Sequence, residues 1–228
     1  MCKQPLIILT GPTAVGKTSL SIKLAKKIGA QIISADSMQV YRHMDIGTAK
    51  ITSSEMQGVK HYLIDEIEPT EEFNVTIFKE KALKAIEQIR NDGYIPMIVG
   101  GTGFYIQALL YDIEFQDNDA DTSYRQELYQ LEKEKGAMYL YEMLKNVDPK
   151  SAESIHYRNV KRVVRALEYY KQTGNRISEH NEEQRKKDSP YNYKYFVLND
   201  IRDNLYERIN KRVDIMYDDG LIDEMQLL

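Results

Sequence analysis

The sequence predicts an α/β fold: a P-loop parallel sheet flanked by helices, with an all-helical insertion. Three observations support this prediction. Residues 11–18, Gly-Pro-Thr-Ala-Val-Gly-Lys-Thr, match the pattern of a phosphate-binding loop (P-loop). Short apolar runs alternate with segments of helical periodicity, which indicates parallel strands joined by helices. Between Ser123 and Arg185 there is no convincing strand pattern, and helix-forming residues and tyrosine dominate.

Composition limits the class of protein. The 228 residues suit one large domain or a core with a subdomain, and 42% hydrophobic with 29% charged residues is typical of a globular chain. Cys2 is the only cysteine, which excludes an internal disulfide and a multi-cysteine zinc site. No apolar run approaches the ~18 residues of a membrane span, so we expect a cytoplasmic protein without a membrane partner. The net charge of −4 means that nucleic-acid binding would need a local basic surface.

The first strand and the P-loop occur in the order that phosphate binding requires. Leu6–Leu9 predicts a buried strand, residues 19–27 predict a helix, and Gly29 ends it. This context favours phosphate binding over a chance match in an ordinary turn. Lys17 would supply a full charge, and the Thr18 hydroxyl would bind a Mg²⁺ ion shared with the phosphates. The predicted phosphate-binding residues are Gly11, Pro12, Thr13, Ala14, Val15, Gly16, Lys17 and Thr18.

Two aspartates follow predicted strands. Gln31–Ser34 predicts the second strand, and Asp36 comes directly after it, where open α/β sheets bind ligands. A turn or helix N-cap is an equally good interpretation of Asp36 from local sequence. His61–Asp65 predicts a third strand; Asp65 could hold a metal-bound water, but a turn role is favoured.

Further alternation completes the predicted core. The apolar spacing from Val75 to Arg90 predicts a helix, Ile95–Val99 a strand, and Phe104–Leu110 a helix after the glycine-rich turn at residues 100–103. The chain returns to the sheet at Tyr195–Leu198 and ends with a helix at Arg202–Tyr217. The predicted domains are a P-loop core at 1–116 and 192–228, and a helical insertion at 117–191.

One helix of the insertion carries a one-sided basic face. Arg158, Lys161, Arg162 and Arg165 follow i, i+3, i+4, i+7 spacing, and Val160, Val163, Val164 and Leu167 form the opposite face. A solvated face usually mixes both charge signs. The pattern therefore favours nucleic-acid contact over a plain surface.

Two arginines share a face of the last long helix. Arg208 and Arg212 are spaced to grip a diphosphate, because guanidinium groups bind its oxygens bidentately. From spacing alone, a surface helix in which they pair with Glu207 and Asp214 is the better interpretation.

Several blocks together resemble the tRNA dimethylallyltransferase family, also called tRNA isopentenyl transferases. The P-loop is generic, but Asp45–Lys50 (Asp-Ile-Gly-Thr-Ala-Lys) and the arginine-rich helix, in this order, are specific. Family members usually have Pro-Asn after the histidine that matches His156, and they generally extend beyond the position of Leu228. The matching blocks, spread over the whole chain, are residues 11–18, 34–41, 44–50, 99–103 and 162–168.

The resemblance implies transfer of a dimethylallyl group from dimethylallyl diphosphate to N6 of adenosine 37, in the anticodon loop of tRNA, with Mg²⁺. It implies that Asp36 is the general base and that Lys17, Thr18 and Arg212 act on the diphosphate. It further implies that tRNA is contacted by Asp36, Ser37, Met38, Gln39, Thr102, Arg125, Lys161, Arg162, Val163, Val164 and Arg165.

Other functions are compatible with a P-loop followed by an aspartate. A small-molecule kinase would consume ATP, whereas prenyl transfer would not. A prenyltransferase acting on free adenine nucleotides would not need the basic helix, and a tRNA-binding protein without turnover would show no transfer. We expect a monomer.

Overall fold

The computed structural model describes residues 3–114 and 123–228. They form two compact units, which we call the core unit (Met1–Ile113 and Ser189–Leu228) and the helical unit (Glu114–Asp188). The boundary expected between residues 116 and 117 lies outside the described residues. At the other boundary, a strand of the core unit begins at Tyr191, whereas the sequence predicted that the insertion includes Tyr191 and that the strand begins at Tyr195. Its buried ring and its pairing with the first strand place it in the sheet.

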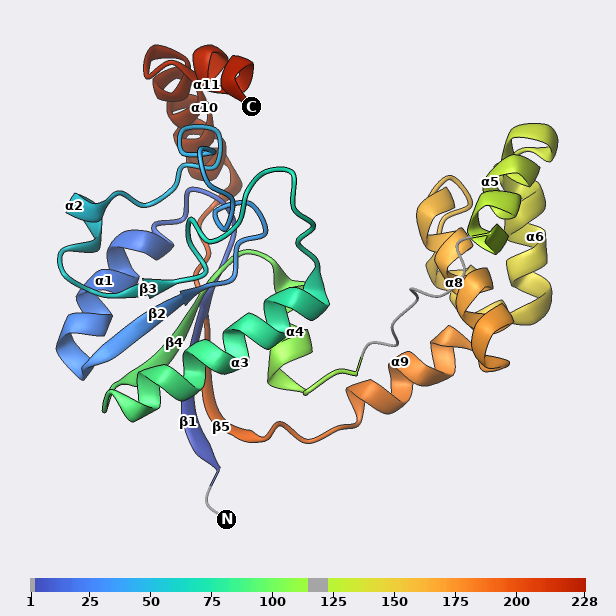
Figure 1. Ribbon diagram of the computed structural model, residues 1–228, viewed down its shortest axis with the longest axis horizontal. Coiled ribbons are helices and arrows are strands. Elements are labelled where there is room, and N and C mark those ends of the chain that lie inside the picture. Colours follow the sequence, from blue (N-terminus) through green and yellow to red (C-terminus); the bar gives the residue numbers. More distant parts are fainter. Residues whose placement is uncertain (1–2, 115–122) are drawn as a thin grey trace. The chain divides into compact units, whose positions relative to one another are not determined.

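The core unit contains the predicted parallel sheet (Figure 1). The strand order is β3-β2-β4-β1-β5, and every pairing between these strands is parallel. All residues of β2 are buried, as expected for strands covered on both faces. The fold class predicted from the sequence is confirmed. The strands are β1 (Gln4–Thr10), β2 (Ala30–Ser34), β3 (His61–Tyr62), β4 (Ile95–Gly100) and β5 (Tyr191–Val197).

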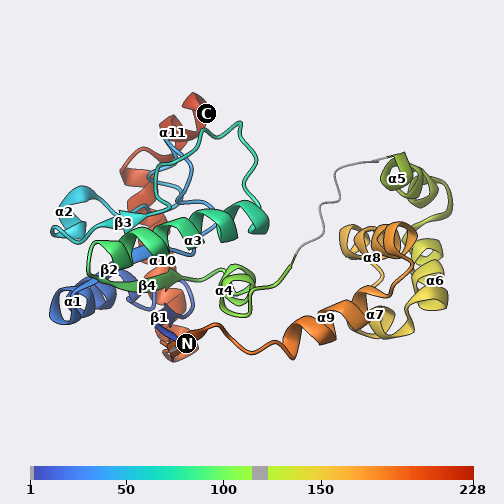
Figure 2. The ribbon, with the colours of Figure 1, turned by 60° about the horizontal axis from the view of Figure 1, so that its bottom comes forward.

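Helices cover both faces of the sheet (Figures 1 and 2). Helix α1 (Lys17–Ile28) packs Ile22 and Ala25 against Ile32 and Met97 on one face. Helices α3 (Val75–Asn91) and α4 (Gly103–Leu110) cover the other face, and α3 begins where the Asn74 side chain accepts hydrogen bonds from two backbone N–H groups. These helices lie where the sequence predicted them, within a few residues at each end.

The third strand is shorter than expected. The sequence predicted His61–Asp65, but β3 ends at Tyr62. Leu63 and Asp65 have φ angles of 61° and 54°, in the left-handed region, which an extended strand cannot accommodate. The chain therefore turns here, and the turn role that the sequence favoured for Asp65 is the observed one.

Tight backbone contacts bring four segments together at the carboxyl ends of the strands. A Cβ atom at Gly100 would lie 2.3 Å from the carbonyl oxygen of Ala35, and the Thr102 N–H donates to the same oxygen at 3.1 Å. A Cβ atom at Gly11 would lie 2.5 Å from the carbonyl oxygen of Leu198. Only glycine permits these two approaches, which bring the turn after β4 against the segment after β2 and the P-loop against the segment after β5. A Cβ atom at Gly101 would lie 3.8 Å from the carbonyl oxygen of Gly11, so the P-loop and the turn after β4 also lie side by side, and all four segments meet at one sheet edge.

The remaining helices of the core unit are α2 (Ser53–Met56), α10 (Arg202–Asp218) and α11 (Leu221–Leu227). Helix α10 matches the helix predicted at Arg202–Tyr217. Gly220, at φ 96°, separates it from α11. None of the helices in residues 3–114 and 123–228 combines the length and apolarity that a membrane crossing would need.

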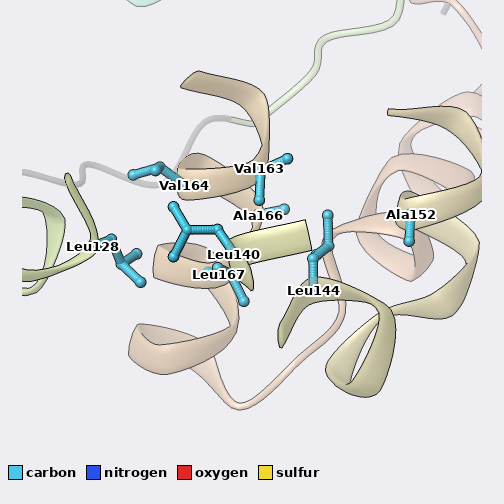
Figure 3. Packing of buried hydrophobic residues seen from close by; sticks show 8 residues of the cluster. All are labelled: Leu128, Leu140, Leu144, Ala152, Val163, Val164, Ala166 and Leu167. Carbon is cyan, nitrogen blue, oxygen red and sulfur yellow. The ribbon is translucent and has the colours of Figure 1, made fainter. Parts of the chain in front are cut away.

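The helical unit consists of α5 (Ser123–Lys135), α6 (Ala137–Val147), α7 (Pro149–Ser154), α8 (Val160–Thr173) and α9 (Ile177–Arg185). Its apolar side chains gather between the helices, as Figure 3 shows. They come from α5, α6, α7 and α8: Leu128, Leu140, Leu144, Ala152, Val163, Val164, Ala166 and Leu167.

Candidate active site

The core unit has a cavity of about 1140 Å³ beside the P-loop. Lys17, Asp36 and Arg212 line it, so residues from α1, from the segment after β2 and from α10 share one space. A volume of this order suits a small organic substrate. The cavity is therefore the candidate active site.

The charged groups of Lys17, Asp36 and Arg212 are close enough to affect the pKa of Lys17. Its Nζ atom donates to the carbonyl oxygens of Gly11 at 2.9 Å and Pro12 at 2.8 Å. Burial lowers the pKa of Lys17, the Asp36 carboxylate raises it, and the Arg212 guanidinium lowers it further, with a net decrease. Two cations and one carboxylate thus converge on the P-loop, which is the arrangement expected for an anionic ligand held beside a proton acceptor.

Asp36 combines the two roles that the sequence left open. The Met38 N–H donates to its Oδ1 atom at 2.9 Å, which is the turn interaction. Its Oδ2 atom makes no hydrogen bond to the described residues, and the residue lines the cavity. The turn fixes the carboxylate while one oxygen stays available for a substrate.

The P-loop has the backbone conformation that its glycines permit. Gly16 has a φ angle of 93° and Ala14 one of 62°, both in the left-handed region. This turn leads into α1, whose N-terminal N–H groups favour an anion. Thr18 lies in the first turn of α1 and lines the cavity.

The donor set fits a magnesium ion of the kind that is shared with phosphates. Mg²⁺ prefers oxygen ligands and is usually bound by one or two protein groups together with substrate phosphates and water. The Thr18 hydroxyl supplies such an oxygen on the wall of the cavity. Within the described residues, no group of three or more His, Cys, Asp or Glu side chains is placed to hold a metal. Asp65, the other aspartate considered for metal, accepts a hydrogen bond from Lys50 at 2.5 Å and does not line the cavity.

The structure brings many, but not all, of the predicted core residues to the cavity. Gly11, Pro12, Ser37, Thr102 and Arg208 do not line it. Gly11 and Pro12 contribute through their carbonyl oxygens to Lys17, and Thr102 begins α4 beside Ala35. The predicted residues that do line the cavity are Thr13, Ala14, Val15, Gly16, Lys17, Thr18, Asp36, Met38, Gln39 and Arg212.

Arg208 and Arg212 lie in different surroundings. Arg208 pairs with Asp200 at 2.7 Å and donates to the Ala14 carbonyl oxygen at 3.4 Å. The sequence had proposed Glu207 and Asp214 as the surface partners. Arg208 thus contacts the P-loop backbone from outside the cavity, whereas Arg212 is part of the cavity wall.

Part of the cavity wall was not predicted from the sequence. Ile209, Val213 and Met216 lie around Arg212 on α10, and their helical spacing could have revealed them. Residues of the loop after β2 and of α11 had no such local signal. They are Met44, Gly47, Thr48, Ala49, Leu221, Glu224 and Met225.

In the helical unit, Lys161, Arg162 and Arg165 are exposed on α8, and within the described residues they form no ion pair with an acid. Arg158 precedes α8, which begins at Val160, so the basic helical face is one residue shorter than predicted. The Arg158 guanidinium instead lies over the Tyr157 ring, 5.6 Å from its centroid.

Two residues expected to contact tRNA are packed in the core of the helical unit, and a third forms an ion pair with a buried carboxylate. The side chains of Val163 and Val164 are buried in the hydrophobic core (Figure 3), which corrects their assignment to a contact surface. Arg125 donates two hydrogen bonds to Glu168 Oε2, at 3.1 and 2.9 Å, and Glu168 is buried. An unpaired buried carboxylate would be costly, so Arg125 has a structural role here.

Comparisons with known proteins agree on one family. The model of the IPP transferase family matches residues 39–228. The tRNA dimethylallyltransferase of Lachnoclostridium phytofermentans is 64% identical over 222 residues, which cover 97% of this chain and 71% of that protein. That of Acetivibrio thermocellus is 51% identical over 223 residues, which cover 98% of this chain and 71% of that protein.

Solved structures give the same result. The full-length tRNA isopentenylpyrophosphate transferase of Bacillus halodurans matches with a TM-score of 0.69 and 46% identity, over 99% of this chain and 70% of that one. A eukaryotic dimethylallyltransferase acting on tRNA matches with a TM-score of 0.82 and 32% identity, over 98% of this chain and 55% of that one. The chain therefore belongs to the IPP transferase family, together with the tRNA dimethylallyltransferases.

Proposed function

We propose that the chain transfers a dimethylallyl group from dimethylallyl diphosphate to N6 of adenosine 37 in tRNA and releases diphosphate. The observation that carries this proposal is the convergence of Lys17, Asp36 and Arg212 on one cavity beside the P-loop. The relatives support prenyl transfer to tRNA, and they support neither the kinase nor the free-nucleotide alternative.

The diphosphate lies against the P-loop. As the allylic C–O bond breaks, negative charge grows on the leaving diphosphate, and interactions that strengthen with this charge lower the barrier. Lys17, Arg212 and the N–H groups at the start of α1 supply positive potential at this position. A magnesium ion held by Thr18 and the phosphate oxygens would offset further charge.

Asp36 accepts the proton that the N6 amine of the acceptor adenosine loses. The N6 amine of adenine is a weak nucleophile, because its lone pair is delocalised into the ring. As the N6–C1 bond forms, the amine proton passes to the Asp36 carboxylate. The Met38 N–H holds Oδ1, so Oδ2 is the oxygen that takes the proton.

The acceptor base has to leave the anticodon-loop stack to reach a cavity. Turning one base out costs a few kcal/mol, and single-stranded loops are where proteins reach base edges most easily. The helical unit supports this step through the exposed cations Lys161, Arg162 and Arg165, which suit a phosphate backbone. We propose that these residues hold the tRNA, in a monomeric enzyme of the cytoplasm.

The test is incubation of the protein with Mg²⁺, labelled dimethylallyl diphosphate and unmodified tRNA. We expect label in the tRNA, no requirement for ATP, and loss of transfer by about 10²–10⁴-fold in Asp36→Ala. Asp36→Asn is the matched variant, because its side-chain oxygen can still accept from the Met38 N–H while it cannot take the proton. Wild-type transfer rates in both variants, with circular dichroism unchanged, would exclude Asp36 as the base.

A further inference from the structure

The loop Asp45–Lys50 is anchored from within the core unit by a buried cation. The Lys50 side chain is only 4% exposed, and its Nζ atom donates to the Tyr41 carbonyl oxygen at 2.6 Å, to Asp45 Oδ1 at 2.6 Å and to Asp65 Oδ1 at 2.5 Å. A buried ammonium with three oxygen partners holds its loop firmly. The anchored loop lines the active-site cavity through Gly47, Thr48 and Ala49.

A carboxylate of α11 anchors the same loop by its backbone. Glu224 Oε2 accepts from the N–H groups of Asp45 and Ile46, both at 2.7 Å, and its Oε1 accepts from the Gly47 N–H at 2.9 Å. Three successive N–H groups around one anion form a nest. Burial would raise the pKa of Glu224, but these three hydrogen bonds outweigh it and lower the pKa, so the carboxylate is ionised at neutral pH.

Close packing accompanies these hydrogen bonds. A Cβ atom at Gly47 would lie 3.2 Å from Leu221 Cδ1 and 3.4 Å from Glu224 Oε1, so α11 lies directly against the loop backbone. Leu221, Glu224 and Met225 of α11 line the cavity, as does the loop. The Glu224 contact therefore sets the distance between these two parts of the cavity wall.

We propose that Glu224 is a positioning residue for the prenyl diphosphate: it fixes the Asp45–Gly47 backbone to α11 and so sets the width of the cavity. This rests on the proposed function, because it takes dimethylallyl diphosphate as the occupant of the cavity. Glu224 acts through the loop and α11, since its oxygens are occupied by backbone N–H groups. A looser wall weakens binding of the small substrate and leaves the reacting groups Lys17 and Asp36 in place.

The kinetic test separates the two substrates. Glu224→Gln keeps the shape of the side chain but replaces one acceptor oxygen by an NH₂ group that opposes an N–H donor. We expect the KM for dimethylallyl diphosphate to rise about tenfold, with kcat and the KM for tRNA within about twofold of wild type. Glu224→Ala should raise the KM for dimethylallyl diphosphate more than Glu224→Gln does. Gly47→Ala should raise it less.

Asp223→Asn is the matched control, because it removes the same charge from the same helix at an exposed position. It should behave as wild type. A lower KM in Glu224→Gln and Glu224→Ala would mean that the carboxylate simply repels the diphosphate, and a fall in kcat with unchanged KM would mean that it acts on the chemistry. Either result overturns the proposal, as does a wild-type KM in both variants.

Hydrogen exchange tests the anchor without any substrate. The amides of Asp45, Ile46 and Gly47 should be protected in the wild-type protein and exchange faster in Glu224→Gln, but not in Asp223→Asn. Unchanged exchange would overturn the anchor directly. If the wild-type protein binds no dimethylallyl diphosphate while this amide difference is present, the proposed function fails and the anchoring by Glu224 stands.

Discussion

Two aspartates, Asp36 in the core unit and Asp148 in the helical unit, show how burial and hydrogen bonding separate a carboxylate that is open to a ligand from one that serves the fold. Asp36 is partly exposed, accepts one hydrogen bond from the protein and lines a cavity. Asp148 is completely buried and accepts four, from the N–H and Oγ–H groups of Ser151 and Ser178, at 2.6–3.0 Å. A saturated carboxylate has no capacity left for a substrate, so its contribution is to stability.

The cations of the two units differ in the same way. Lys17 and Arg212 lie in the wall of one cavity, where a small anion can contact both. Lys161, Arg162 and Arg165 lie on an exposed helix face, where they suit an extended row of phosphates. The positive charge of the core unit thus suits the proposed diphosphate, and that of the helical unit suits the proposed tRNA backbone. The following predictions test this division, from the largest expected effect to the smallest.

Asp148→Asn should be the most damaging change in the helical unit. Asn keeps one acceptor oxygen and places an NH₂ group against serine donors, so we expect a loss of about 2–3 kcal/mol in the free energy of unfolding. Burial would raise the pKa of Asp148, but the hydrogen bonds from Ser178 and Ser151 outweigh it and lower the pKa. The stabilisation is therefore present above the unfolded-state pKa of about 3.9 and is lost as pH falls through the lower folded-state value.

Urea denaturation between pH 3 and 7 measures this effect. The wild-type protein should lose stability toward acid more steeply than Asp148→Asn, because the variant lacks the titrating group. Glu153→Gln, on an exposed site of the same helix as Ser151, is the control and should be neutral. Equal stability of wild type and Asp148→Asn would contradict the structural role.

The sequence predicted well what local patterns determine. The P-loop, strands β1, β2 and β4 and helices α1, α3, α4 and α10 follow from apolar periodicity and glycine positions, whereas β5 begins four residues before the predicted Tyr195. The helical periodicity also placed Arg162 and Arg165 on the exposed face and Val163 and Val164 on the opposite, buried face, as the structure shows. The family resemblance, in contrast, implied that the whole segment contacts tRNA. A helix turns successive residues to different faces, so a continuous segment cannot act as one surface.

Other features depend on distant parts of the chain. Glu224 reaches a loop 177–179 residues earlier in the sequence, and nothing local to either segment indicates that contact. The partner of Arg208 is Asp200, which lies in the turn before α10 rather than on the helix face from which Glu207 and Asp214 were considered. The end of β3 depends on left-handed conformations of Leu63 and Asp65, which residues other than glycine adopt uncommonly and which no local pattern predicted here.

Reversing charge on the exposed face of α8 should weaken tRNA use without affecting the small substrate. For Arg162→Glu with Arg165→Glu, we expect the KM for tRNA to rise by at least about tenfold, and the salt dependence of log Kd to become shallower by about 1.4 for two lost single-strand phosphate contacts. The KM for dimethylallyl diphosphate should not change. Filter binding at several salt concentrations, with steady-state kinetics, measures both quantities.

Lys133→Glu is the matched control, since it reverses one charge at an exposed position of α5 in the same unit. It should lower tRNA affinity less than Arg162→Glu alone or Arg165→Glu alone, each of which also reverses one charge. If Lys133→Glu and the α8 variants weaken binding equally, the whole charge of the unit matters, and the α8 face is not a specific contact surface.

The smallest effect should come from Arg208, which tests the contrast between a cation inside the cavity wall and one outside it. Arg208→Ala removes a partly exposed ion pair with Asp200, an interaction usually worth less than about 1 kcal/mol, so the KM for dimethylallyl diphosphate should change by less than about fivefold. Arg212→Ala, four residues along the same helix, should raise it by more than about tenfold, because it removes a charge that shares the cavity with Lys17. Titration calorimetry with inorganic diphosphate and Mg²⁺ should give the same order. If Arg208→Ala were as damaging as Arg212→Ala, the diphosphate would have to be gripped by both guanidinium groups, and Arg208 would have to exchange Asp200 for the substrate during the reaction.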